Sequence, residues 1–498
     1  MQRQAGGCIH SRGNNMIRIS GLRRSMALVS FVGLLVGLSA STALAQQTIN
    51  ISSGTISHDI CGNAANTITG NCAATNDSDG NTITIGSGVN AAGFAVYGKY
   101  ADNWMGDNFA IGNQINFGGA AGRVYGSYAM SDAGKQNATA ADNTVSMTDG
   151  QARGVYGGFA FCWRNCTAEA SGNTVSISGG TVLETIVGGN VTPTGSGARG
   201  VASNNTVEIK GNAIIDPAVT LYGSFSLSSK TALNNTLELY LSDVAVFTLS
   251  DFQNLNFHLP ATLEANDTML AASNTANVGG ATIGIGIERQ RISLIDPAND
   301  VSVSRLQVGE KIVLLDGGSV LGGLPAPANV PGVVTSEGYT FNLSRASNQI
   351  VATLMNAPAP LIGAVPAGAP DTTSASFTAA SNRSGIAAWR VIETAGGASC
   401  SSVSMTVAAS GTHHMVAGTP FSVPVSGLRA GTDYAFCLAP LTENLTRNGS
   451  IVQLGFVTAS TLRAAPTPVP TLGNAALMLL VLVMVGGASV ALRLRCRQ

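Results

Sequence analysis

The stretch NTVSISGGTV, which runs from Asn173 to Val182, decides the fold, because weaker copies of it recur at a nearly constant interval. The other copies start at Asn81, Asn113, Asn143, Asn205 and Asn235, so that successive starts differ by 32, 30, 30, 32 and 30 residues. A degenerate first copy, TINISSGTI, spans 48–56. A second phrase recurs at the same interval, at Val96-Tyr97-Gly98, Val124-Tyr125-Gly126, Val155-Tyr156-Gly157, Ile186-Val187-Gly188 and Leu221-Tyr222-Gly223. Two phrases that share one period indicate a repeat protein.

Each copy alternates as a β-strand does. Val175 and Ile177 fall on one face and the polar residues between them on the other, and Gly179-Gly180 supplies a turn. One unit has too little apolar surface to fold alone, so stacked units must bury a shared Val/Ile column. We therefore predict an all-β chain with a parallel β-solenoid of about seven 30–32-residue repeats. Its recurrent Asn amides and Tyr rings would stack from coil to coil. A propeller or a sandwich of hairpins with the same period is the alternative.

The composition excludes one large class of function. Charged residues make up 11% of the 498 residues and the formal net charge is −1, so no basic surface is available for nucleic acid. The 60 glycines, together with abundant Asn, Thr and Ser, are typical of a turn-rich β protein.

The N-terminus has the features of a secretory signal peptide. Basic residues precede an apolar run over 26–40, and Ala43-Leu44-Ala45 forms a small-x-small cleavage site. We predict a signal peptide over 1–45, removed by signal peptidase so that the mature chain begins at Gln46. An uncleaved anchor helix is the alternative, and translation starting at Met16 rather than Met1 stays open.

The cysteines agree with export to an oxidising compartment. Setting aside Cys8 and Cys496, six cysteines form three close pairs along the chain. Metal binding is the alternative for the Cys162–Cys166 pair, although no second pair stands at zinc spacing. We predict disulfides Cys61–Cys72, Cys162–Cys166 and Cys400–Cys437.

The NTVSISGGTV and VYGG phrases resemble the passenger domains of Gram-negative autotransporter adhesins. The resemblance implies a right-handed β-helix displayed at the cell surface. We assign 46–240 to the repeat solenoid and 241–357 to its continuation and cap, where the period fades. Strand-like segments in the second part are 282–288, 311–315, 339–343 and 350–354.

A linker over 358–370 precedes a segment that reads as a small β-sandwich over 371–460. The phrase LRAGTDY, which ends at Tyr434, resembles the strand entry of fibronectin type III modules, where a Tyr packs a corner. We expect Trp389 to fill the core between the sheets. The predicted strands are 374–379, 388–393, 403–408 and 434–438.

The C-terminal segment resembles the IPTL-type sorting domain, a relative of the PEP-type signals that exosortase-like membrane proteases read. A Pro-rich tether over 461–468 leads to the motif Val469, Pro470, Thr471 and Leu472, and then to eighteen uncharged residues over 475–492. Eighteen helical residues reach about 27 Å, close to the thickness of a bilayer core. The resemblance implies cleavage near the motif and transfer to the cell surface, and a plain membrane anchor is the alternative. The basic tail that would stay cytoplasmic contains Arg493, Arg495 and Arg497.

No catalytic motif is visible in the sequence. His58 and His258 stand alone, which favours structural roles, and the acidic residues Glu184, Glu208 and Glu238 do not share a register in our interpretation. The stretch over 76–81 reads as a turn rather than a Ca²⁺ loop. We therefore expect no enzyme activity and no cofactor. The predicted function is a structural or adhesive surface protein whose partners are the membrane, glycans or neighbouring cells; the alternative is a polysaccharide lyase or hydrolase, which would need two carboxylates within about 5–10 Å of each other in a groove.

Overall fold

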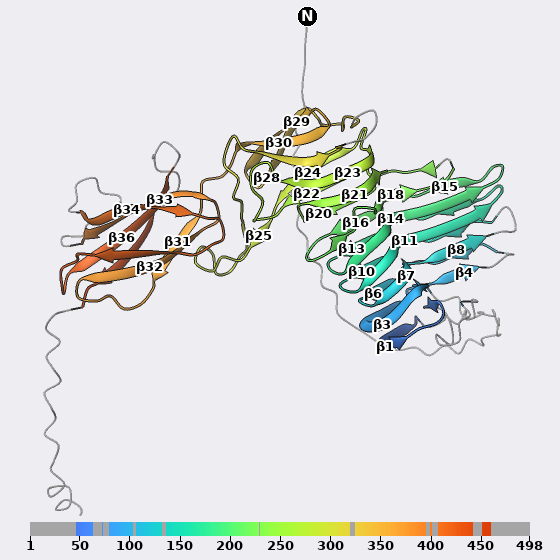
Figure 1. Cartoon of the computed structure of the whole chain (residues 1–498), viewed down its shortest axis with the longest axis horizontal. Coiled ribbons are helices and arrows are strands. Elements are labelled where there is room, and N and C mark those ends of the chain that lie inside the picture. Colours follow the sequence, from blue (N-terminus) through green and yellow to red (C-terminus); the bar gives the residue numbers. More distant parts are fainter. Residues whose placement is uncertain are drawn as a thin grey trace, which may run out of the picture. The chain divides into compact units, whose positions relative to one another are not determined.

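Figure 1 shows the computed structural model of the chain. The structure describes residues 46–62, 72, 79–102, 106–131, 136–228, 230–318, 324–394, 399–400, 407–441 and 451–459. Regular structure in these ranges consists of β-strands, and none of it is a helix long and apolar enough to cross a membrane. The predicted signal peptide, Pro-rich tether, sorting motif, membrane span and basic tail lie outside the described residues.

The repeated phrase forms the first sheet of a parallel β-solenoid (Figure 1). Successive copies pair in parallel and in register, so that Val145 lies beside Val175 and Val175 beside Val207. The degenerate copy pairs in the same way, Ile49 with Ile83. The solenoid prediction is confirmed, and the propeller and hairpin-sandwich alternatives are wrong. The strands of the first sheet are β1 (Thr48–Thr55), β3 (Thr82–Tyr97), β6 (Gln114–Phe117), β10 (Thr144–Met147), β13 (Thr174–Ile177), β16 (Thr206–Ile209), β20 (Thr236–Leu239), β22 (Asn254–Leu259) and β24 (Thr282–Ile287).

Two further runs of parallel strands complete the coils. The second run continues from the far half of β3 through β7 (Ala120–Tyr125), β11 (Gln151–Trp163), β14 (Thr181–Thr194), β18 (Thr220–Phe225), β21 (Val244–Ser250), β23 (Thr268–Asn277) and β27 (Lys311–Asp316). Short strands pair alongside it: β2 (Ile60–Cys61), β4 (Tyr100–Asp102), β8 (Tyr128–Ser131) and β17 (Ile214–Ile215). The third run is β5 (Asn108–Phe109), β9 (Ala138–Thr139), β12 (Thr167–Glu169), β15 (Arg199–Val201) and β19 (Lys230–Thr231).

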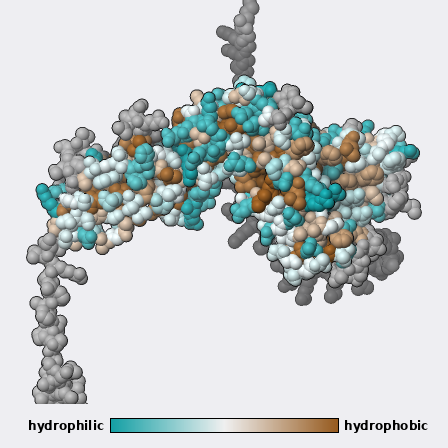
Figure 2. Space-filling view, viewed as in Figure 1, coloured by the Kyte–Doolittle hydropathy of each residue, from teal (hydrophilic) through white to brown (hydrophobic). Residues whose placement is uncertain are grey.

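The alternation of each strand fills the interior of the solenoid. Val175 and Ile177 are fully buried, as predicted, and their register partners in other coils are buried with them. Stacking thus removes a continuous aliphatic column from water, which a single coil could not do. In the view of Figure 2, hydrophilic and intermediate residues cover much of the surface and hydrophobic residues gather in limited patches.

The recurrent asparagines form a buried ladder along the solenoid. The Oδ1 atom of Asn173 accepts hydrogen bonds from the backbone N and from Nδ2 of Asn143, at 3.0 and 2.9 Å. Asn173 Nδ2 in turn donates to Asn205 Oδ1 and to the carbonyl of Ala140. Gln253 ends the ladder, because its Oε1 accepts from the backbone N of Asn235. The predicted coil-to-coil stacking of the Asn side chains is confirmed.

The glycine of the second phrase is required by this ladder. A Cβ built on Gly157 would lie 2.3 Å from the carbonyl oxygen of Gly188 and 2.7 Å from Cβ of Asn173. Gly126 and Gly188 meet the same two neighbours in their own coils, a carbonyl oxygen and an asparagine Cβ. The two phrases share one period because the glycine of one packs directly against the asparagine of the other.

Two columns of stacked aromatic rings accompany the second run of strands. Tyr125 stacks on Tyr97 and on Tyr156, with ring centroids 5.1 and 4.6 Å apart. Tyr128 stacks likewise on Tyr100 and on Phe159, at 5.0 and 4.5 Å. The predicted tyrosine column is confirmed, whereas the second column was not predicted.

The C-terminal end of the solenoid departs from the repeat. From Thr236 to its partner Asn254 the coil is only 18 residues long, and no strand of the third run lies between them. After β27 the pairing becomes antiparallel, and this change closes the end of the second run. The strands of this cap are β28 (Gly332–Ser336), β29 (Tyr339–Ala346) and β30 (Gln349–Asn356). A two-stranded antiparallel ribbon of β25 (Arg289–Gln290) and β26 (Val301–Ser302) follows β24 in the chain.

Two antiparallel sheets follow in the chain and share one apolar core. The Tyr434 hydroxyl accepts a hydrogen bond from the backbone N of Arg429 at 2.9 Å, the arrangement of a tyrosine corner. Trp389 packs against this core while partly exposed. The sheets are β31 (Ile362–Pro366), β32 (Ser374–Ser381) and β35 (Phe421–Ser426), and β34 (Val407–Met415), β33 (Gly385–Glu393), β36 (Asp433–Leu441) and β37 (Val452–Val457).

Candidate functional site

The outer face of the first sheet carries a polar column that becomes acidic toward its C-terminal end. Glu208 on β16 is the register partner of Glu238 on β20, and Glu238 is that of Asn256 on β22. Our interpretation that these glutamates do not share a register was therefore wrong for this pair. The sequence signal was present, because each glutamate stands three residues after its ladder asparagine. Glu184 lies on β14, in the second run of strands.

His258 is not a lone histidine, contrary to our interpretation. Its Nε2 lies 2.7 Å from Oε2 of Glu238, and its ring stacks on Tyr240 with centroids 3.9 Å apart and planes 4° from parallel. The short coil between β20 and β22 brings His258 beside residues only 18 to 20 positions earlier in the chain. A constant period of about 30 residues would not have placed it there.

Glu238 organises this cluster with both of its carboxylate oxygens. Oε1 accepts a hydrogen bond from Asn256 Nδ2 at 2.8 Å, while Oε2 contacts His258. Burial raises the pKa of Glu238, but the hydrogen bonds from His258 and Asn256 outweigh it and hold the pKa below the usual value. Glu238 is therefore ionised at neutral pH. Glu208 is also engaged, by Ser176 Oγ at 2.6 Å and by Lys210 Nζ at 2.8 Å.

The next strand, β24, leaves the outer face bare. Its sequence TIGIGI directs isoleucines inward and places glycines at the outward positions 284 and 286. A Cβ on Gly284 would lie 2.2 Å from Asn256 Oδ1, and one on Gly286 would lie 2.5 Å from His258 Nδ1. Asn256 and His258 therefore lean over a strip of backbone that carries no side chains.

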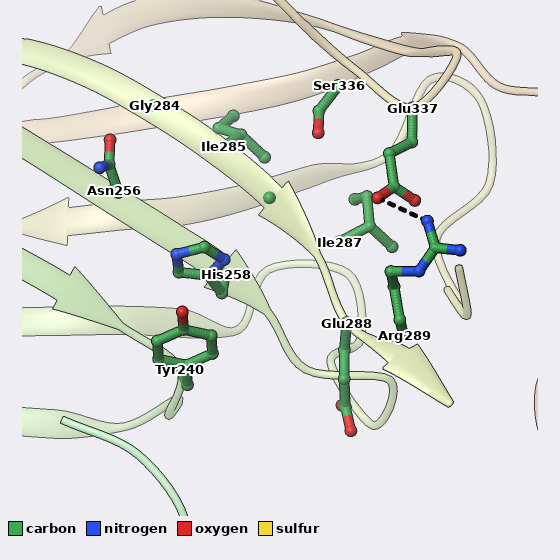
Figure 3. Close-up of a pocket in the computed structure, with 11 residues that line it drawn as sticks. Tyr240, Asn256, His258, Gly284, Ile285, Ile287, Glu288, Arg289, Ser336 and Glu337 are labelled. Carbon is green, nitrogen blue, oxygen red and sulfur yellow. Dashed lines mark hydrogen bonds and ion pairs between the residues drawn. The ribbon is translucent and has the colours of Figure 1, made fainter. Parts of the chain in front are cut away.

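A cavity of about 660 Å³ lies over this strip (Figure 3). Asn256, His258 and Tyr240 line it, as do Ser336 and Glu337 at the end of β28 and the turn that follows. Glu337 Oε1 accepts from Arg289 at 3.0 Å, the contact drawn in Figure 3. A neighbouring cavity of about 680 Å³ shares Tyr240, His258 and Glu288 with the first and extends to Lys210, Asn212 and Thr262. We call the two cavities together the β24 groove.

The groups that line the groove suit hydrogen bonding better than proton transfer. The carboxylate of Glu288 accepts from the backbone N of Ala261 and from Gln290, so it too is already engaged. Within the described ranges, no group of three or more His, Cys, Asp or Glu is placed to hold a metal ion. The groove can present amide, imidazole, hydroxyl and carboxylate oxygens and nitrogens to a polar ligand.

The structure also locates the cysteines, the remaining histidines and the other segments considered in the sequence analysis. The disulfides Cys61–Cys72, Cys162–Cys166 and Cys400–Cys437 are confirmed. His413 and His414, which the sequence analysis did not single out, lie within strand β34. In the stretch over 76–81, the carboxylate of Asp79 accepts a hydrogen bond from Nζ of the buried Lys99 at 3.0 Å. Residues 76–78 of this stretch lie outside the described residues. Gln46 is described, whereas Ala43 and Ala45 are not.

Comparison with known proteins adds no relative. No family model matches the chain, no curated protein matches it in sequence, and no solved structure matches its fold.

Proposed function

We propose that this chain is an exported protein whose solenoid is displayed at the cell surface as a structural or adhesive module without catalytic activity. The observation that carries the proposal is that all six cysteines among the described residues form disulfides, both in the solenoid and in the C-terminal sheets. Such bonds persist outside the reducing cytosol. The secretory features of 1–45 agree with this location.

The outer face of the first sheet supports an adhesive role. Its rungs, such as Thr144 with Ser146 and Thr174 with Ser176, carry hydroxyls that repeat in register from coil to coil. Repeated, uncharged hydrogen-bonding groups on a rigid scaffold suit contact with glycans or with surfaces of neighbouring cells. Rigidity comes from the buried asparagine ladder, which fixes the distance between rungs.

The proposal includes how the protein is held and released. The motif Val469, Pro470, Thr471 and Leu472 would be read by an exosortase-like protease while the apolar span over 475–492 holds the chain in the inner membrane as a single helix. We further propose that the solenoid is right-handed, and that the two C-terminal sheets form a fibronectin type III-like sandwich between it and the tether. The tyrosine corner at Tyr434 supports the second point.

A polysaccharide lyase or hydrolase is the second candidate, and one observation favours it. Glu208 and Glu238 are register partners on adjacent strands, which lie about 4.8 Å apart, so two carboxylates stand side by side on one face, as such an enzyme would need. We rank it second because each carboxylate already has a partner, Lys210 for Glu208 and His258 for Glu238, and because the lowered pKa of Glu238 makes it a poor general acid.

The test is intact-mass analysis and cell fractionation of the expressed chain, with and without Leu472 and everything after it. We expect a mature product that starts at Gln46, ends between Val469 and Leu472, and lies on the outer surface. A product that keeps its tail to Gln498 and stays with the inner membrane would show that the C-terminus is only an anchor. Release of new reducing ends from a polysaccharide, abolished by Glu208→Gln, would instead establish the enzyme.

A further inference from the structure

We infer that the β24 groove binds a neutral, hydroxyl-rich saccharide, as the recognition site of the proposed surface module. The inference rests on the proposed surface function, because only a displayed protein would meet such a ligand. Asn256 and His258 form one wall of the groove and Ser336 and Glu337 the other. Strand β24 forms the floor between them, with its glycine positions and with Ile285 and Ile287.

The orientation of the first wall decides which groups the ligand must offer. Glu238 uses Oε1 to hold Asn256 Nδ2 and Oε2 to hold His258 Nε2. The remaining polar atoms, Asn256 Oδ1 and His258 Nδ1, then lie over Gly284 and Gly286. Both are acceptors when His258 Nε2–H donates to the ionised Glu238, so the ligand must supply hydrogen-bond donors at two fixed points. The closely spaced hydroxyl groups of a sugar can donate to both of these atoms.

The charge of the groove excludes acidic saccharides. Glu288 and Glu337 line the groove together with the cations Arg289 and Lys210, and both cations are already paired, Arg289 with Glu337 and Lys210 with Glu208. A uronic acid or a sulfated sugar would find no unpaired cation among these lining residues and would lie beside the carboxylates of Glu288 and Glu337, which repel it. The volume of the cavity over the floor, about 660 Å³, is within the range found for binding sites of small organic molecules.

An extended peptide added to the edge of β24 fits less well. The side chain of Asn329 already occupies that edge, because Ile283 N donates to its Oδ1 at 3.0 Å and its Nδ2 donates to Ile283 O at 2.9 Å. A peptide strand would have to displace this amide before it could pair along β24.

The test measures binding of cellotriose, maltotriose, laminaritriose, mannotriose and chitotriose to the purified full chain by isothermal titration calorimetry, with trigalacturonate as the acidic comparison. We expect at least one neutral trisaccharide to bind with a Kd of about 1 mM or tighter, and trigalacturonate not to bind. Glu238→Gln and Gly286→Ala should each weaken binding about tenfold or more, since the first loses one of its two acceptors and the second puts a methyl group against His258. Ser336→Ala, on the opposite wall, should weaken it less.

The matched control is Gly93→Ala, because a Cβ there has no neighbour within 4 Å. It should bind as the parent does. The inference is overturned if no neutral trisaccharide binds, if trigalacturonate binds best, if a Thr-Val repeat peptide binds in their place, or if Glu238→Gln, Gly286→Ala and Ser336→Ala fold and bind as the parent does. These results are separate from export, so a correctly sorted chain that binds no saccharide refutes the groove alone. A binding chain that stays at the inner membrane refutes the surface role alone.

Discussion

The asparagine that opens each copy of the repeat serves three neighbours at once. Asn173 accepts from the backbone and side chain of Asn143 and donates to Asn205 and to the carbonyl of Ala140. An amide is needed because it combines an acceptor with two donors, and neither Asp nor Ser offers that set. This role was predictable from the sequence, since the residue recurs at the head of every strand.

Asn173→Ala should lower the free energy of unfolding by about 3 kcal/mol, because two buried donors of Asn143 lose their acceptor. The urea midpoint followed by circular dichroism would measure the change. Thr174→Ala is the matched control on the outer face, with an expected effect within about 0.5 kcal/mol. Equal midpoints for the two variants would show that the ladder adds nothing to stability.

Gly157→Ala should be more damaging than its small size suggests. The added methyl group would overlap the carbonyl of Gly188 and Asn173 Cβ, which are backbone and ladder atoms that cannot move independently. Overpacking of this kind costs about 1–3 kcal/mol or more. Thermal melting should show a clear loss against Gly93→Ala, and a melting temperature equal to that of the control would mean that the coils separate easily.

At the scale of the element, strands and their register were predictable, but the candidate site was not. The alternation of Val175 and Ile177 and the spacing of the copies are local features, and the structure follows them. His258 meets Glu238 only because one coil shrinks to 18 residues, and nothing in the period signals that change. The bare floor of β24 likewise depends on which neighbours lean over Gly284 and Gly286.

The tyrosine columns should make the protein sensitive to alkali. Burial raises the pKa of Tyr128 to about 12 and raises the pKa of Tyr125 and Tyr156 as well. Because the unfolded chain loses these protons near pH 10, the native state binds more protons above that pH, and stability falls as the pH rises toward the folded pKa. Absorbance at 295 nm should show late titration in the native chain and titration near pH 10 in urea. A native curve that matches the unfolded one would contradict the burial of the columns.

At the scale of the whole molecule, register is the property on which the solenoid depends. Each coil contacts mainly its two neighbours, so stability is approximately a sum over coils and interfaces. One coil can therefore be removed if the strands that become neighbours still match. The pairing of Thr144 with both Gln114 and Thr174 shows that β6 and β13 would match after removal of the coil between them.

Deleting residues 144–173 should leave a folded protein that is one rung shorter, by about 4.8 Å. The deletion joins Asn143 to Thr174, so Asn143 takes the place of Asn173 in the ladder and donates to Asn205. It removes Cys162 and Cys166 together and leaves no unpaired thiol. Circular dichroism, resistance to proteolysis and a cooperative melt are the measurements. Deleting 144–158 instead removes half a coil and joins Asn143 to Phe159, which sets Phe159 and Phe161 at outward positions and puts Ala160 and Cys162 in place of Val145 and Met147 in the aliphatic column, so that variant should not fold. If both deletions behave alike, folding does not depend on register, and the ladder follows from the fold rather than specifying it.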